Sequence, residues 1–354
     1  MKAPASFSTL FSIGLVQEAL FSILTRVELL LRVRSLSTEC RDWVDAELRH
    51  ADAGGLTCAR PADVAAGLQV QLLHHFVRIE GARVLLPAAM YILEADEANP
   101  AHMLNGLRPG LEARPGGLTK AAIAAFQAWR PEWREGYGPL RIADGVTLVG
   151  QEGAVLEGKQ AGLEVKTEGV RFESLHFPLG VIVRNGSLTM VKCTSTATGL
   201  NHSIEVHAGA SLVMVDTRVS GCVKDEAVNG DGLVCRGKMQ LTRCTVEENG
   251  GTGIVAQGAL DEATAELVDC VIRKNEDDGV VAGSRAKVTL RGGTVSGNGN
   301  DGVAASVGGQ ITVSKEQPTE AKNNERADWI MEGRGVIEGV AAEKITRDPQ
   351  INSS

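Results

Sequence analysis

Short apolar segments with alternating polar positions recur along the second half of this chain. The segments SLTMVKC, SLVMVDT, KMQLTRC and AELVDC end 24, 27 and 26 residues apart (217 − 193, 244 − 217 and 270 − 244), at Cys193, Thr217, Cys244 and Cys270. Alternation of this kind predicts short, half-buried β-strands. A repeat of this length has no room for a ten-residue helix between its strands, so the pattern predicts a β-helix, a solenoid in which successive coils stack.

A second register supports the same repeat. Residues that open an apolar strand after a turn also recur at steps in the twenties, at Gly180, Ser203, Gly232, Gly253, Gly279 and Gly302. Asparagines stand four residues before the last three of these glycines, at Asn249, Asn275 and Asn298. We expect these asparagines to stack from coil to coil and to satisfy buried backbone groups at a tight turn. Leucine-rich repeats have a similar period, but their L-x-x-L-x-L pattern is missing here.

The string EGYGPLRIADGVTLVGQEGAVLEG, from Glu135 to Gly158, resembles the opening coil of pectate-lyase-like right-handed β-helix proteins. This resemblance implies a right-handed parallel β-helix. It is specific for the fold and says almost nothing about the activity. We place the solenoid at residues 117–320, with a capping helix near Leu118–Trp129, because an open end would expose apolar core and unpaired strand edges.

Residues 1–50 carry apolar positions at steps of three and four residues, which predicts helices with one apolar face. Residues 51–116 are mixed and are expected to form a mostly helical connection, and residues 321–354 a C-terminal cap and tail. The expected fold class is therefore mainly β, a right-handed parallel β-helix preceded by a small α-helical region.

Aspartates precede three of the strand-start glycines, at Asp231, Asp278 and Asp301, and Thr252 takes this place in the coil between the first two. Aligned carboxylates could serve as general acids and bases on a sugar, or could hold calcium. The favoured interpretation is that each aspartate hydrogen-bonds backbone at its turn. Lys224 or the pair Arg273 and Lys274 could add a cation to such a site.

The charge and the aromatic content of the chain limit the classes of partner that it can bind. The net charge of −8 argues against a nucleic-acid surface. Residues 141–320 contain 17 Lys and Arg against 23 Asp and Glu (17 − 23 = −6) and neither Trp nor Tyr, which counts against sugar stacking and makes an anionic polysaccharide less favourable. His202 and His207 are expected at the surface. No apolar run approaches the roughly 20 residues that a membrane span needs.

Seven cysteines occur without a CxxC pair, so neither a zinc site nor a redox dithiol is predicted. Cys193, Cys244 and Cys270 share one repeat position and are expected to stack as small buried side chains. Reduced thiols favour a cytoplasmic or nuclear protein; the modestly apolar run from Phe7 to Val16 keeps secretion as the alternative.

The string IGLVQEALFSILTRVELLLRVRSLSTECRDWV, from Ile13 to Val44, resembles an F-box, the helical module that docks a substrate receptor onto the adaptor subunit of cullin-type ubiquitin ligases. The matching positions are Leu15, Glu18, Leu20, Ile23, Leu24 and Val27, followed by Arg34 and Trp43. Val16 stands where the family usually has Pro, and the spacing after Val27 departs from the family. An ordinary amphipathic helix pair that caps the solenoid would show the same stripe.

Three functions follow from these observations. The first is a non-catalytic recognition protein, in which the F-box-like segment binds the cullin adaptor and the β-helix binds an unknown protein target, with no cofactor or metal. The second is a carbohydrate-active β-helix enzyme, a polysaccharide lyase, hydrolase or epimerase, with Asp231, Asp278 and Asp301 as its acid cluster and calcium as a candidate ion. The third is a structural scaffold.

Overall fold

The computed structural model describes residues 142–348, apart from 152, 158–162, 179, 197–201, 225–228 and 259–260, together with 56–57, 77, 80–86 and 90–92. The chain divides into two compact units, residues 1–56 and 57–354. Within the described ranges the regular elements are parallel β-strands and one short 3-10 helix, Ala342–Lys344. No helix in these ranges is long and apolar enough to cross a membrane.

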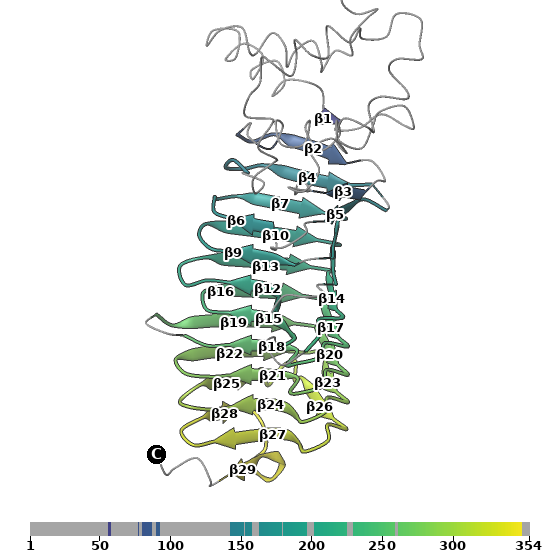
Figure 1. Ribbon diagram of the computed structural model, residues 1–354. Coiled ribbons are helices and arrows are strands. Elements are labelled where there is room, and N and C mark those ends of the chain that lie inside the picture. The colour runs from purple at the N-terminus through teal and green to yellow at the C-terminus, as the bar shows by residue number, and fades with distance from the viewer. Residues whose placement is uncertain are drawn as a thin grey trace, which may run out of the picture. The chain divides into compact units, whose positions relative to one another are not determined.

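The strands form a parallel β-helix with three sheets, and between residues 147 and 332 each coil contributes one strand to each sheet in turn (Figure 1). Sheet A has the order β1 (Leu56–Thr57), β2 (Arg83–Leu86), β4 (Thr147–Gly150), β7 (Val170–Glu173), β10 (Ser187–Val191), β13 (Ser211–Val215), β16 (Lys238–Thr242), β19 (Ala263–Val268), β22 (Ala286–Arg291), β25 (Gln310–Val313) and β28 (Val336–Glu338).

Sheets B and C complete the coil. Sheet B contains β3 (Met90–Ile92), β5 (Val155–Glu157), β8 (His176–Phe177), β11 (Thr194–Ser195), β14 (Arg218–Ser220), β17 (Thr245–Glu247), β20 (Val271–Arg273), β23 (Thr294–Ser296) and β26 (Glu320–Lys322). Sheet C contains β6 (Leu163–Val165), β9 (Val181–Val183), β12 (His202–Val206), β15 (Asp231–Cys235), β18 (Ile254–Ala256), β21 (Val280–Ala282), β24 (Asp301–Ala305), β27 (Ala327–Glu332) and β29 (Thr346–Asp348).

The core consists of columns of aliphatic side chains, because equivalent inward positions pair in register from coil to coil. One column in sheet A runs through Leu188, Leu212, Met239, Ala265, Val288 and Ile311, and each of these side chains is almost completely buried. Outward positions alternate with inward ones along each strand, as in β16, where Lys238 and Gln240 are exposed and Met239 and Leu241 are buried. The alternation in the sequence therefore predicted the strands and their orientation correctly.

The asparagine ladder lies at the turn from sheet B to sheet C. Asn249 donates its side-chain amide to Oδ1 of Asn275 (2.9 Å), Asn275 donates to Asn298 (3.0 Å), and Asn298 donates to Asn324 (2.8 Å). Each Oδ1 also accepts the backbone N–H of the preceding asparagine. The predicted stack is confirmed, and it extends one coil further than the sequence indicated.

The ladder explains the glycine four residues after each asparagine. A Cβ on Gly253 would lie 2.7 Å from Nδ2 of Asn275 and 2.7 Å from the carbonyl oxygen of Gly279. A larger residue would therefore displace the ladder of the next coil. In the coil of Asn324 the equivalent position is Asp328, whose carboxylate accepts the amide of Asn324 (2.8 Å) and ends the ladder.

Strands occur beyond both predicted ends of the solenoid. Within the predicted connection of residues 51–116, β2 pairs with β4 and β3 with β5. Within the predicted cap and tail of residues 321–354, β27 and β29 continue sheet C. The strands described in these stretches are too few to show a period. The helices expected at residues 1–50 and at Leu118–Trp129 lie outside the described residues.

Replacement of Asn275 by Ala should lower the free energy of unfolding by about 3 kcal/mol. The substitution removes the oxygen that accepts both the side-chain amide and the backbone N–H of Asn249, and each unsatisfied buried group costs roughly 1–3 kcal/mol. Urea unfolding followed by far-UV circular dichroism measures the loss. Asn324→Ala, at the less buried end of the ladder, is the matched control and should lower the free energy of unfolding by less. Equal losses of stability in the two variants would show that burial of the ladder does not set its contribution.

Candidate functional site

One repeat position at the start of sheet C gathers polar residues from successive coils. The strand registers align His202, Asp231, Thr252, Asp278, Asp301 and Ala327. We call this row the aspartate column. It runs along the solenoid axis beside the asparagine ladder, at the turn between sheets B and C.

The three candidate aspartates do not converge on one point. Asp278 and Asp301 lie in adjacent coils, and neighbouring parallel strands are about 4.8 Å apart. The coil of Thr252 separates Asp231 from Asp278, which puts these two residues about 10 Å apart at the same spacing. The register thus creates one pair of neighbouring carboxyl groups, Asp278 with Asp301.

The aspartates also bind backbone groups of the following coil. Oδ1 of Asp231 accepts the N–H of Thr252 (2.9 Å), and Oδ1 of Asp278 accepts the N–H of Asp301 (2.8 Å). The side-chain amide of Asn300 donates to the same oxygen of Asp278 (2.7 Å). The carboxylates of Asp231 and Asp278 therefore bind backbone of the following coil rather than of their own turn.

The Asp278 and Asp301 pair is electrostatically unusual. The side chain of Asp301 is only 2% exposed, and burial, reinforced by the neighbouring charge of Asp278, raises the pKa of Asp301 to about 6. Burial also raises the pKa of Asp278, against the opposing effect of the hydrogen bonds from Asp301 and Asn300. A carboxyl group with a pKa near 6 can exchange a proton at neutral pH, as general acids and bases must.

Cations flank the column at two places. Nη1 of Arg326 lies 3.1 Å from Oδ2 of Asp301, and Nη2 of Arg326 donates to Asp348 (2.6 Å). Lys224 pairs with Asp277 (2.6 Å), the residue next to Asp278. Lys224 was a predicted cation for this site and lies beside it, whereas Arg273 binds Glu247 on sheet B.

His202 occupies the first position of the column. Its Nδ1 lies 3.3 Å from Oδ2 of Asp231, and the side chain is 12% exposed. His202 was expected at the surface and is only partly exposed, because the pairing of β12 with β15 places it next to Asp231. His207 follows β12 and is 30% exposed beside Glu205.

An aliphatic strip borders the column on the outward face of sheet C. Val255 and Val281 are neighbours in the register of β18 and β21, and both are half-buried. In the next coils Ala304 and Ile330 continue the strip and are buried. The site therefore combines carboxyl groups, cations and an apolar surface, which is the usual mixture in a ligand site.

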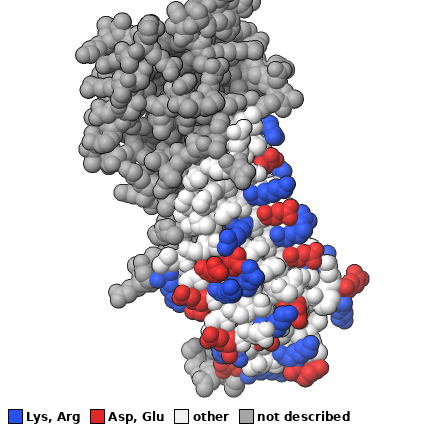
Figure 2. Space-filling view, turned by 90° about the vertical axis from the view of Figure 1, so that its right-hand side faces the viewer, with Lys and Arg blue, Asp and Glu red and all other residues white. Residues whose placement is uncertain are grey.

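Sheet B shows no comparable concentration of one charge. On the side of the solenoid where Figure 1 draws β14, β17 and β20, acidic and basic side chains are interspersed (Figure 2). The buried carboxylate of Glu247 lies between Arg218 (2.8 Å) and Arg273 (2.7 Å), and both guanidinium groups help to lower its pKa. The ion pairs described here neutralise one another on this surface.

The cysteine column is part of the core. Cys193, Cys244 and Cys270 are 1–2% exposed and follow one repeat position, with Thr217 in the coil between the first two. Burial raises the pKa of the Cys193 thiol to about 11. Neutral, buried thiols suit packing better than nucleophilic chemistry.

In the described part of the chain, no group of three or more His, Cys, Asp or Glu side chains could hold a metal ion. The calcium site considered for the aspartate column therefore has no ligand set there. The candidate adaptor-binding residues Leu15, Glu18, Leu20, Ile23, Leu24 and Val27 lie outside the described residues.

Arg326 and Asn300 contribute to the site and were not recognised in the sequence. Arg326 pairs with Asp301 across 25 residues, and Asn300 with Asp278 across 22. Asn300 stands one residue before Asp301, and Arg326 one residue before Ala327, the next member of the column. Extending the repeat register beyond Val313 would have brought Arg326 to this row.

Comparison with known proteins supports the fold. The family described as "Right handed beta helix region" matches residues 231–335, so the parallel β-helix is right-handed. No curated protein matches the sequence significantly.

Solved structures align with most of this chain at low sequence identity. The A-module of the mannuronan C-5 epimerase AlgE4 from Azotobacter vinelandii is 14% identical over 83% of this chain and 88% of its own, with a TM-score of 0.49. The A-module of the Azotobacter vinelandii epimerase AlgE6 is 14% identical over 78% of this chain and 80% of its own, with a TM-score of 0.47. Pectate lyase Pel9A is 12% identical over 78% of this chain and 72% of its own, with a TM-score of 0.45.

The raised pKa of Asp301 makes stability depend on pH. Its ordinary value is 3.8 and its folded value about 6, so the folded chain holds a proton between these values that the unfolded chain has released. Stability from this group is fully present below pH 3.8 and is lost as pH rises through about 6, by about 3 kcal/mol at most.

We therefore expect the wild type to lose stability relative to Asp301→Asn as pH rises from about 4 to about 7. Urea unfolding at several pH values measures this difference. Asp261→Asn, in an exposed turn, is the control and should follow the wild type. Parallel pH curves for wild type and Asp301→Asn would contradict the assigned pKa.

Proposed function

We propose that this solenoid is a carbohydrate-active β-helix that acts on a polysaccharide at the aspartate column. The observation that carries the proposal is the Asp278 and Asp301 pair, two carboxyl groups in adjacent coils with raised pKa values beside Arg326. Neighbouring carboxyl groups of this kind can keep one proton between them near neutral pH. Such a pair can both donate and accept a proton during cleavage or epimerisation of a sugar.

The two carboxyl groups have different roles in this proposal. Asp278 is half-buried and contacts the substrate as the acid or base, whereas Asp301 is buried behind Arg326. Asp301 is therefore a positioning residue, which sets the charge of Asp278 and holds Arg326. Arg326 remains 42% exposed and can bind a hydroxyl or carboxyl group of the sugar.

Substrate recognition in this region depends on hydrogen bonds and aliphatic contacts. Lys224 and Arg326 supply donors at two places along the column, and Val255 and Val281 supply an apolar strip for the C–H faces of sugar rings. A chain polymer laid along the solenoid axis would meet these groups in successive coils.

Incubation with a panel of neutral and acidic polysaccharides tests the activity and identifies the reaction class. New reducing ends indicate hydrolysis, unsaturated products indicate elimination, and altered NMR signals without chain shortening indicate epimerisation. Asp278→Asn should reduce the rate by a factor of 100 or more, because general acid or base catalysis contributes about 10²–10⁴-fold. Asp301→Asn should shift the pH profile as well as the rate.

Asp231→Asn is the matched control, since it lies in the same column two coils away from Asp278. It should retain activity close to that of the wild type if the pair alone does the chemistry. The proposal fails if no polysaccharide is altered, or if Asp278→Asn is as active as the wild type.

Adaptor binding by the N-terminal segment is a second candidate function, supported by the F-box-like positions in residues 13–44. If this segment docks on a cullin adaptor, co-purification should be lost in Leu20→Asp and Ile23→Asp, because a charge in the apolar stripe opposes burial. Ser35→Asp, outside the matching positions, is the control. Equal recovery of the adaptor with all variants would exclude this function.

A further inference from the structure

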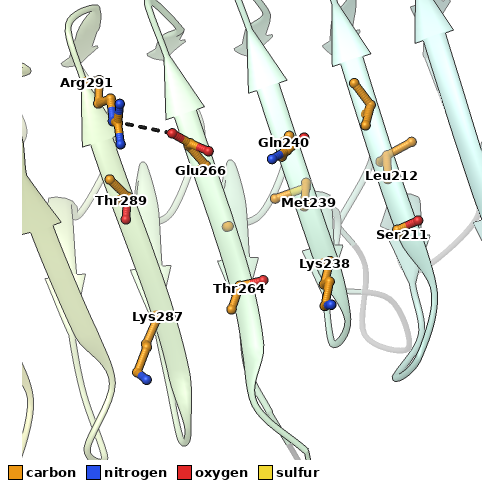
Figure 3. Close-up of a pocket in the computed structure, with 12 residues that line it drawn as sticks. Ser211, Leu212, Lys238, Met239, Gln240, Thr264, Glu266, Lys287, Thr289 and Arg291 are labelled. Carbon is orange, nitrogen blue, oxygen red and sulfur yellow. Dashed lines mark ion pairs between the residues drawn. The ribbon is translucent and has the colours of Figure 1, made fainter.

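A shallow groove of about 510 Å³ lies on the outward face of sheet A, across β13, β16, β19 and β22 (Figure 3). Outward side chains of these four strands line it, and it belongs to a different sheet from the aspartate column. One row along its edge runs through Lys238, Thr264 and Lys287, which pair in register. The groove is therefore a surface separate from the aspartate column, and equivalent positions of successive coils line it.

Several polar groups of this groove have no partner in the described part of the chain. Lys238 makes no side-chain hydrogen bond or ion pair there, and neither do Gln240 and Thr264. The other two cations of the groove have exposed acidic neighbours, since Lys287 pairs with Glu262 (2.7 Å) and Arg291 with Glu266 (3.3 Å). Exposed pairs of this kind contribute little stability and exchange partners readily.

The charge of the groove is opposite to that of the chain. The groove is lined by Lys238, Lys287 and Arg291 against Glu266, and Glu262 pairs with Lys287 at its edge, which gives 3 − 2 = +1, whereas the whole chain carries −8. In Figure 3 Lys238 and Lys287 lie on either side of Thr264, and Arg291 points toward Glu266. A local positive surface on an acidic protein favours an acidic partner.

The spacing of the lysines specifies the shape of that partner. Lys238 and Lys287 are two coils apart, which corresponds to about 10 Å at 4.8 Å per strand. A polyproline II segment has three residues per turn and rises about 3.1 Å per residue, so residues i and i+3 lie on one side about 9 Å apart. The lining contains no aromatic side chain on which a sugar ring could stack.

The geometry points to a docking site for an extended acidic protein segment, with two carboxylates three residues apart bound by Lys238 and Lys287. Thr264, between the lysines, and Gln240 on the same strand as Lys238 can hydrogen-bond the backbone of the segment. The site does not depend on the aspartate column, and it gives the solenoid a protein-binding surface in addition to its proposed activity.

Fluorescence anisotropy with labelled synthetic peptides tests this site on the full chain. The peptide GPDPPDPG should bind saturably, and at least tenfold more tightly than its amide counterpart GPNPPNPG. The peptide GPDPDPPG has the same charge with its aspartates two residues apart, and should bind more weakly because its carboxylates face different sides. Binding should weaken with added salt.

The double variant Lys238→Ala and Lys287→Ala should lose at least tenfold in affinity while retaining the circular dichroism of the wild type, since both side chains are exposed. Lys344→Ala, in the 3-10 helix near the C-terminal end, is the matched control and should bind normally. Absence of saturable binding, equal affinity for the three peptides or an unaffected double variant would overturn the proposal. Binding of polygalacturonate but not of the peptide would do the same, and would make the groove a carbohydrate surface.

Discussion

The structure depends on the hydrogen bonds of the asparagine ladder. The amides of Asn249, Asn275 and Asn298 are buried and each donates to the next asparagine, so the turn between sheets B and C repeats from coil to coil. A side chain at the strand-start glycine would enter the space of the neighbouring asparagine, as at Gly253 and Asn275. Asparagine and glycine are thus two parts of one constraint, which fixes the register of the coils.

The candidate site follows from that register. Because the ladder aligns the coils, residues that precede the strand-start glycines fall into one column, and only Asp278 and Asp301 are both neighbours and acidic. Arg326 then covers Asp301 and joins it to Asp348 in the last strand of sheet C. Burial of Asp301 and the neighbouring charge of Asp278 together account for the high pKa of Asp301. Both causes arise only when the two coils stack.

The outward surfaces of sheets A and B differ in whether their charged side chains are paired. On sheet B the carboxylate of Glu247 is bound by Arg218 and Arg273, so the ions satisfy one another. On sheet A the repeat places Lys238 and Lys287 on either side of Thr264, and the charge of Lys238 has no partner among the described residues. The same stacking therefore produces a self-neutralised face and a face that can accept an acidic segment.

The sequence by itself determined the repeat, the alternation of inward and outward residues, and the asparagine stack, because each depends on residues at fixed intervals along the chain. It did not reveal the coil of β2 and β3 or the strands after Val313, because too few repeats remain there to establish a period. Only the tertiary structure decided that Asp231 stands apart from Asp278 and Asp301, that His202 joins their column, and that Arg326 binds Asp301. Because the coils differ in length, residues that become neighbours are not separated by a constant interval in the sequence. The burial that sets their pKa values arises only when the coils stack.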